Sequence, residues 1–286
     1  MSADENCNVE DLIAVLATDP GIASELLRLS NSSLFGVTRE ISSLQQAVTL
    51  LGMGRVRTLV LGKYMVERVD ADAMTGVDFD FSYYWRRSLG TAVLAAKFAD
   101  QLAPRHREEA FIASLMSDIG VVVMLRAIPN DYAVVAAEYA PLHGENFLDQ
   151  ELAAVGITHA DVSSVVMDKW KFPPMVVEAV RQHHSDTLTE HREDDAHTLA
   201  RSLGAAGLMA KLLYELNDRD VVVRVCATAM EIGGLNALAF QNALQDLDST
   251  VSDFAKLLNI DIIESKMYSR ICEIVAETLE HRTSVV

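Results

Sequence analysis

Apolar residues recur at helical spacing along most of the chain, and this periodicity restricts the fold more than any other feature. Trp85, Leu89, Ala92 and Ala96 follow one another at steps of four, three and four, which places them on one helical stripe. The stretch 110–126, AFIASLMSDIGVVVMLR, predicts a buried helix in which Asp118 is the one carboxylate. Aromatic residues make up 6% of the chain and prolines number six, which favours helices over sheets. We therefore expect an all-α fold.

Polar stretches divide the helical pattern into three predicted parts. Residues 1–70 form an N-terminal lobe of short helices, and the acidic segment 70–80, DADAMTGVDFD, links it onward. Residues 80–205 form a helical core, and residues 206–286 form a C-terminal helical extension whose last helix ends at Arg282. We expect this extension to pack on the core, with dimer formation as the alternative, because apolar stripes of this kind usually face a core.

Capping and turn signals place several helix ends. Ser43 followed by Gln46 is the pattern of a capping box, and Pro173-Pro174 is typical of a helix start. Turns are predicted at 31–36 and 52–54. The polar stretch 185–197 predicts an exposed loop.

Charge and cysteine content exclude several classes of protein. The formal net charge of −17 opposes binding to nucleic acid and to anionic lipid, so we expect neither DNA binding nor membrane association. We interpret the short basic cluster of Arg55, Arg57 and Lys63 as a solvated helix face. No stretch has the length and composition of a membrane span, which predicts a cytoplasmic protein. The three cysteines, at 7, 226 and 272, lack metal-site spacing and indicate a reducing compartment, and we expect two of them to be core packing residues.

Three segments resemble a known family. Residues 19–36 (DPGIASELLRLSNSSLFG), 42–62 (SSLQQAVTLLGMGRVRTLVLG) and 159–184 (HADVSSVVMDKWKFPPMVVEAVRQHH) are similar to the HDOD domain, a diverged branch of the HD phosphohydrolase superfamily. With the helices that contain Trp85 and Asp118, the resemblance covers residues 9–205. It implies an HD-like helical bundle.

The resemblance also implies where a catalytic metal centre would lie. Enzymes of the superfamily hold one or two metal ions between helices with histidine and aspartate, which bind a divalent cation and activate its water. The first histidine position of that pattern falls on Arg87, which cannot ligate a metal, and the histidine of the His-Asp doublet falls on Ser117. The late aspartate falls near Arg201 or Ser202. The matching residues that remain are Asp118, His159, His183 and His184.

These replacements predict a site without catalytic residues, metal or cofactor, because a guanidinium repels a dication at close range. We expect Arg87 to neutralise Asp118 in a charge-assisted hydrogen bond; a capping or hydrated Asp118 is the alternative. His159 is either a former ligand facing the pocket or a hydrogen-bonded core residue. His183 and His184 close a helix, where capping is the alternative to a pocket role.

The resemblance implies a non-enzymatic signalling or regulatory module of bacteria. Its partner would be an unidentified signalling protein, with a nucleotide or cyclic dinucleotide as a second class of ligand. We expect docking near the turns at 31–36 and 52–54, because turn residues often carry binding functions. The alternative is a residual metal-dependent phosphodiesterase or nucleotide phosphohydrolase that uses Asp118, His159, His183 and His184.

Overall fold

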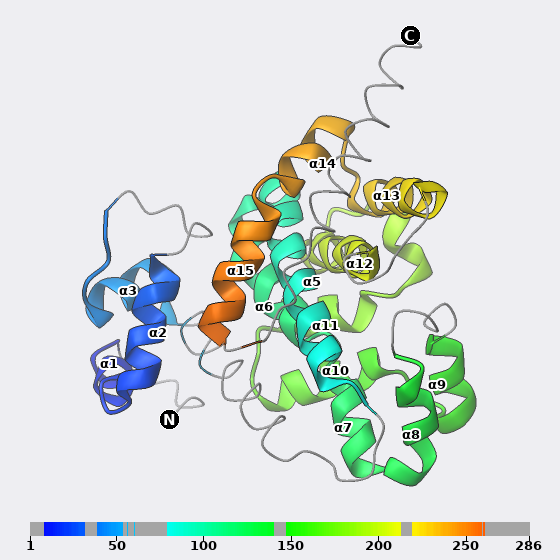
Figure 1. The fold of residues 1–286 in the computed structure, drawn as a ribbon, viewed down its shortest axis with the longest axis horizontal. Coiled ribbons are helices and arrows are strands. Elements are labelled where there is room, and N and C mark those ends of the chain that lie inside the picture. The colour runs from blue at the N-terminus through cyan, green and yellow to red at the C-terminus, as the bar shows by residue number, and fades with distance from the viewer. Residues whose placement is uncertain are drawn as a thin grey trace.

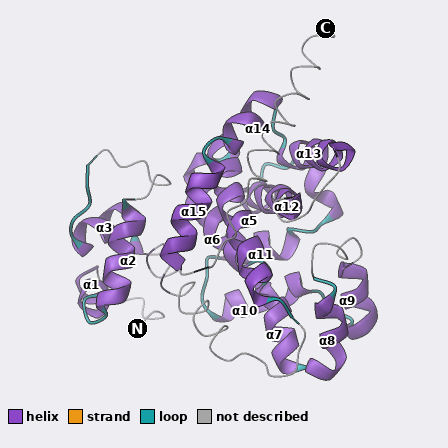
Figure 2. Ribbon diagram, viewed as in Figure 1, coloured by secondary structure: helices purple, strands orange, loops and turns teal. Residues whose placement is uncertain are grey.

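The computed structural model describes residues 9–31, 39–53, 56, 60, 79–139, 147–212, 219–258 and 260. In this part of the chain all regular secondary structure is helical, which confirms the all-α prediction (Figures 1 and 2). The elements are α1 (Val9–Leu16), α2 (Pro20–Ser30), α3 (Leu44–Leu51), α5 (Phe81–Leu102), η2 (Pro104–His106), α6 (Arg107–Met116), α7 (Ile119–Ala127), α8 (Pro129–Ala137), α9 (Phe147–Val155), α10 (His159–Lys169), α11 (Pro174–Gln182), η4 (Asp186–Thr189), α12 (Asp195–Leu212), α13 (Arg219–Gly233), α14 (Ala237–Leu244) and α15 (Leu247–Leu258).

Helices α1 to α3 form a small lobe beside the main body (Figure 1). Their buried side chains make a core of their own, which consists of Leu16, Leu26, Val48, Leu51 and Val56. The predicted cap of α3 is confirmed, because the Ser43 hydroxyl accepts a hydrogen bond from the Gln46 N–H. The reciprocal bond differs from a standard capping box: Gln46 Oε1 accepts from Ser42 rather than from Ser43.

Helix α5 is the central helix of the main body and packs against α6, α12, α14 and α15. The sequence predicted one buried stripe on it, and this was too narrow. Its buried residues lie on every side of the helix, and even Arg87 is only 8% exposed. The physical reason is that neighbouring helices surround α5, so the faces off the predicted stripe are also removed from water.

The stretch 110–126 is not the continuous helix that the sequence predicted. Helix α6 ends at Met116 and α7 begins at Ile119. Asp118 has φ −101° and ψ 11°, outside the helical region, and its side chain makes no capping hydrogen bond to α7. The break instead directs the carboxylate towards α10 and α11, whose residues contact it.

The C-terminal helices share the main core, as the sequence favoured. Phe240 of α14 stacks on Phe98 with ring centroids 5.7 Å apart, and Phe254 of α15 lies 4.6 Å from Phe111. Val222 and Cys226 of α13 belong to the same buried cluster. The helix predicted to end at Arg282 lies outside the described residues, and the boundaries of the three predicted parts stay a prediction.

The stretch 185–197 is more ordered than the exposed loop that the sequence predicted. It contains η4 and the first turn of α12, and Leu188 and His197 are buried. A close approach to α12 accompanies this: a Cβ built on Gly204 would lie 2.8 Å from the His183 carbonyl oxygen and 2.5 Å from Leu188 Cδ1, so the glycine lets the segment pack against the helix.

Several other predictions fall outside the described residues. They concern Cys7, Cys272, the basic cluster of Arg55, Arg57 and Lys63, the linker as far as residue 78, and residues 32–36 of the first turn. Cys226 is buried, as predicted for a packing residue.

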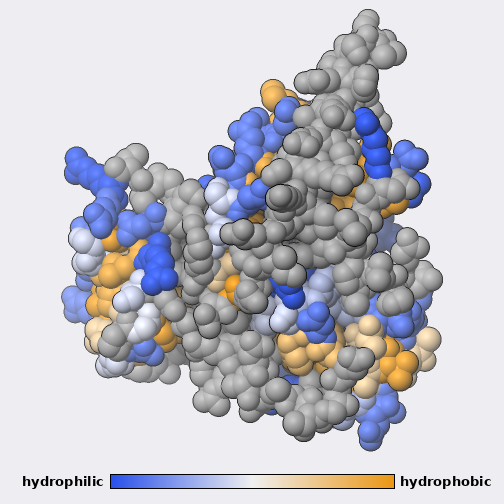
Figure 3. Space-filling model, viewed as in Figure 1, coloured by the Kyte–Doolittle hydropathy of each residue, from blue (hydrophilic) through white to orange (hydrophobic). Residues whose placement is uncertain are grey.

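In the described part, one helical stretch, 104–127, is long and apolar enough to cross a membrane. The rest of the protein buries 83% of its most apolar window, as expected of a core helix. Helices α13 and α14 pass the same test only as a pair, and the chain bends by 108° between them. Hydrophilic and apolar residues are mixed on the face shown in Figure 3.

Candidate functional site

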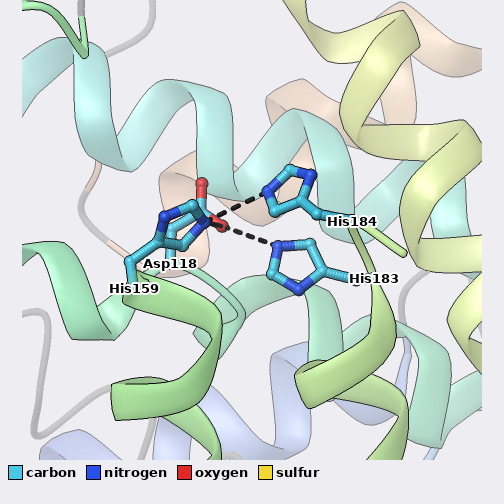
Figure 4. Close-up of side chains that lie close together, drawn as sticks. All are labelled: Asp118, His159, His183 and His184. Atoms are coloured by element: carbon cyan, nitrogen blue, oxygen red, sulfur yellow. Dashed lines mark hydrogen bonds and ion pairs between the residues drawn. The ribbon is translucent and has the colours of Figure 1, made fainter. Parts of the chain in front are cut away.

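Four residues that the sequence singled out converge where helix ends meet. Asp118 lies at the break between α6 and α7, His159 begins α10, and His183 and His184 follow the end of α11 (Figure 4). One ligand atom from each residue lies within 4.8 Å of every other. We call these four residues the Asp-His cluster.

The start of α10 positions His159. Thr158 and Asp161 form a capping box that fixes this helix end. Helix α7 then approaches closely, because Gly120 donates its N–H to Ser163 Oγ at 2.8 Å. A Cβ on Gly120 would lie 2.2 Å from the His159 carbonyl oxygen, so the glycine is required for this contact.

Glu151 of α9 sets the orientation of the His159 ring. Its Oε2 lies 2.8 Å from His159 Nδ1 and also accepts the His159 backbone N–H at 2.9 Å. Its Oε1 accepts a hydrogen bond from the Tyr132 hydroxyl. Because a carboxylate only accepts, Nδ1 carries the hydrogen, and Nε2 faces the cluster at 3.1 Å from His184 Nε2.

His183 has the same ring orientation by a different means. Its Nδ1 lies 2.6 Å from the Val180 carbonyl, which accepts the Nδ1 hydrogen. Its Nε2 lies 3.4 Å from Asp118 Oδ1 and is buried without a hydrogen-bond partner.

Asp118 is held by three neighbours besides the histidines. Tyr139 donates its hydroxyl to Oδ2 at 2.5 Å, and Ser117 Oγ lies 3.0 Å from Oδ1. The Arg87 guanidinium lies 3.7 Å from Oδ2 and 4.5 Å from the centre of the Tyr139 ring. The predicted pairing with Arg87 is therefore confirmed as an ion pair, but the hydrogen bond comes from Tyr139.

The neighbouring charges decide the ionisation of Asp118. Burial raises the pKa of its carboxyl, but Arg87, together with His183 and His159, outweighs that effect and holds this pKa well below its usual range. Asp118 is therefore a carboxylate in the folded protein, as a metal ligand or an ion-pair partner must be.

His184 is a neutral imidazole. Burial, with the added influence of His183 and His159, holds its pKa well below the usual value. The alternative that a charged His184 caps α11 is therefore not supported, although His183 does occupy the C-cap position.

Arg201 and Ser202 do not join the cluster. The Arg201 Nε donates to the Ile232 carbonyl at 2.7 Å, and the guanidinium lies against Gly234. Ser202 Oγ donates to the Thr198 carbonyl within α12. Of the two arginines that the resemblance singled out, Arg87 lies beside Asp118, and Arg201 attaches α12 to the end of α13.

Sequence reasoning missed Glu151, Tyr132 and Tyr139, although one signal was available for Glu151. Phe147, Glu151 and Val155 follow one another at steps of four, so a carboxylate stands on an otherwise apolar stripe of α9. Glu151 is 0% exposed. A charge at such a position indicates a buried partner.

The cluster fits a single divalent ion. Bonds of about 2.0–2.1 Å in a tetrahedral site separate neighbouring donor atoms by roughly 3.4 Å. Three of the six separations are 3.1 Å for His159–His184, 3.4 Å for His183–Asp118 and 3.7 Å for His159–Asp118, and all six lie within 4.8 Å. The partners of His159 Nδ1 and His183 Nδ1 are those that orient metal-binding histidines. The unpartnered Nε2 of His183 is the atom that such an ion would satisfy.

Solved structures share this fold. A presumed phosphohydrolase from Shewanella amazonensis SB2B superposes with a TM-score of 0.64 at 23% identity and covers 90% of each chain. An HDOD domain protein of unknown function from Geobacter sulfurreducens gives 0.60 at 17%, covering 92% of this chain and 89% of its own. A presumed signal transduction protein from Marinobacter aquaeolei VT8 gives 0.54 at 20%, covering 90% of this chain and 57% of its own.

Sequence comparison assigns the family. An uncharacterized protein of Treponema pallidum (strain Nichols) is 23% identical over 218 residues, or 74% of this chain. The chain spans 40% of the length of that relative. The model of the HDOD domain matches residues 1–186, which is well over half of the chain. The chain therefore belongs to the HDOD domain family.

Proposed function

We propose that the protein is a non-enzymatic regulatory module that acts in bacterial signal transduction by binding a partner protein. One observation carries this proposal. The positions at which the resemblance implies a first histidine ligand and a doublet histidine hold Arg87 and Ser117, and both side chains contact Asp118. An arginine and a serine at these two positions cannot complete a centre of two ions.

Membership of the HDOD family supports the regulatory half of the proposal, and the Marinobacter signal transduction protein has the same fold. The relative contributes only a likeness of fold at its level of identity. We therefore infer the signalling role mainly from the family and the site together.

A metal-dependent phosphohydrolase is the second candidate, and the unpartnered Nε2 of His183 favours it. Asp118, His159, His183 and His184 would hold one ion. When bound, a divalent ion supplies Lewis acidity towards a phosphate oxygen. Arg87 would then face the same phosphate as a positive charge.

An assay of hydrolysis separates the two candidates. Full-length protein is incubated with Mn²⁺, Fe²⁺ or Zn²⁺ and a cyclic dinucleotide, with bis(p-nitrophenyl) phosphate as a generic diester. We expect no turnover above that of the Asp118→Ala variant. Turnover by the wild type that Asp118→Ala abolishes, while the exposed Asp149→Asn retains it, would establish the phosphohydrolase instead.

Partner binding is tested on the surface near the turn at 52–54. Leu50 of α3 is 39% exposed beside this turn, and Leu238 of α14 is 67% exposed on another helix. Crosslinking in native cells should recover a partner with the wild type and with Leu238→Glu, but not with Leu50→Glu. Equal recovery by both variants would contradict docking at this turn.

A further inference from the structure

We infer that the exposed sides of α8 and α9 dock a segment of a partner protein in which apolar side chains are flanked by lysine or arginine. The inference rests on the proposed function in requiring a partner protein, and it adds the chemistry of that partner and a second place of contact. It does not depend on the Asp-His cluster. The α8–α9 surface, as we call it, consists of Asp131, Val134, Ala137, Glu138, Leu152 and Ala153.

Two contacts hold α8 and α9 side by side in antiparallel directions. Tyr132, near the start of α8, donates its hydroxyl to Glu151 in the middle of α9. Tyr139, which follows α8, lies 5.5 Å from Phe147 at the start of α9, measured between ring centroids. All four side chains are buried, so they mark the sides of the two helices that face the core. The opposite sides therefore face solvent.

These solvent-facing sides carry apolar residues. Val134 is 79% exposed and Leu152 is 51% exposed. Ala137, three residues after Val134, and Ala153, next to Leu152, are exposed as well. Figure 3 shows apolar residues over α8 and α9, at the lower right of the molecule. Single exposed apolar side chains are common on any protein, but a group of them on adjacent helices is typical of an interaction site.

The charge of the surface defines the class of partner. Asp131 precedes Val134 by three residues and Glu138 follows it by four, so the three side chains share one stripe of α8. The sequence from residue 128 to residue 158 contains no lysine or arginine. An apolar surface bordered by carboxylates complements apolar side chains that are bordered by cations. The partner segment is therefore basic.

The same carboxylates disfavour two other occupants. In a symmetric dimer the α8–α9 surface would meet its own copy, which would bring Asp131 and Glu138 of both chains into one interface. An anionic lipid surface would also repel them. A basic protein segment is the occupant that leaves no like charges opposed.

A synthetic peptide tests the charge preference on the full-length protein. The probe is a fluorescein-labelled helical peptide with leucine on one face and lysine on both borders of that face, and its twin has glutamate in place of lysine. Fluorescence anisotropy gives the affinity of each peptide. We expect the lysine probe to bind at least about tenfold more tightly, because its twin opposes like charges. Equal affinities would overturn the inferred class of partner.

Matched variants locate the binding. Val134→Lys and Leu152→Lys place a cation on the α8–α9 surface and should each weaken binding of the lysine probe at least about tenfold. Leu238→Lys makes the same change of charge at a 67% exposed position of α14 and should stay within about twofold of the wild type. An equal loss with Leu238→Lys would overturn the inference, because the probe would then respond only to net charge. Leu50→Glu should also bind as the wild type does, so failure of docking near the turn at 52–54 and failure here are separate results.

Site-specific photocrosslinking in native cells identifies the natural occupant. Benzoylphenylalanine replaces Val134 in one variant and Leu238 in the other, and mass spectrometry reads the sequence of the crosslinked segment. We expect position 134, and not position 238, to label a segment in which apolar residues stand beside lysine or arginine. A crosslink to a second copy of this chain, to lipid or to an acidic segment would overturn the inference, as would a yield at 134 no higher than that at 238.

Discussion

Glu151 supports the cluster without belonging to it, because it contacts His159 and not the other three residues. Its carboxylate is fully buried and accepts three hydrogen bonds, from the Tyr132 hydroxyl and from two groups of His159. An unpaired carboxylate at such a position would be very unfavourable, so these bonds offset its desolvation. They also restrict His159 to one tautomer.

Replacing Glu151 with glutamine should therefore destabilise the protein. One of the two carboxylate oxygens becomes an amide nitrogen, which cannot accept, so at least one buried donor loses its partner. We expect the free energy of unfolding to fall by about 2–4 kcal/mol, measured by urea denaturation. The exposed Asp149→Asn on the same helix should change it by less than about 0.5 kcal/mol. Equal effects of the two substitutions would contradict this role of Glu151.

Tyr139 supplies the hydrogen bond that the sequence assigned to Arg87. Tyr139→Phe keeps the ring over which the guanidinium lies and removes only the hydroxyl. Because the acceptor is charged, we expect a loss of about 1.5–3 kcal/mol in unfolding free energy. A double-mutant cycle with Asp118→Asn should give a coupling energy above about 0.5 kcal/mol. Additive effects would show that the two side chains do not interact in solution.

The sequence predicted the residues that make up the cluster but not the residues that orient them. The resemblance indicates which positions correspond to metal ligands in the enzymes of the superfamily, so it singled out Asp118, His159, His183, His184 and the arginine at position 87. It carries no information on groups that only orient those ligands. Tyr139 follows α8 and Glu151 lies on α9, and their approach to the cluster depends on helix packing that no local pattern specifies.

At the scale of elements, the contact between α7 and α10 fixes the position of two cluster residues. Asp118 precedes α7 and His159 begins α10, so the spacing of these helices sets the distance between the two side chains. Gly120 allows the approach and its N–H bonds to Ser163 across it. The sequence predicted a helix through Gly120 but not the break two residues earlier, because apolar periodicity continues on both sides of Ser117 and Asp118.

Gly120→Ala should therefore separate the two helices. The added Cβ would meet the His159 carbonyl at 2.2 Å, and backbone cannot yield as a flexible side chain does. We expect a loss of more than about 2 kcal/mol in unfolding free energy, as overpacking of a core causes. Gly207→Ala in α12 is the matched control, since nothing lies within 4 Å of its Cβ, and it should stabilise by about 0.5–1 kcal/mol. A neutral Gly120→Ala would show that the helices are not in tight contact.

At the scale of the whole molecule, the described residues form two separate cores. The five-residue core of the N-terminal lobe is distinct from the larger core around α5, and α2 touches α15 where the two bodies meet. Periodicity predicted helices in both, and the acidic segment 70–80 suggested a division between them. Helices between residues 81 and 260 share one core. The sequence favoured this packing but could not specify it, because an apolar stripe on one helix does not reveal which other helix covers it.

Two large-to-small substitutions test whether the cores unfold independently. Leu51 is 1% exposed in the small core and Leu94 is 0% exposed in the middle of α5. Replacement of either by alanine removes buried methyl groups and leaves a cavity, at a cost of about 2–5 kcal/mol. A core built on five buried side chains has little stability to lose, so Leu51→Ala should raise amide hydrogen exchange across residues 9–53 and leave 81–212 protected. Leu94→Ala should lower protection throughout α5, α6 and α12, because all three share its core. If Leu51→Ala instead loosened both regions equally, contacts such as that of α2 with α15 would be strong enough to join the lobe and the body into one cooperative unit.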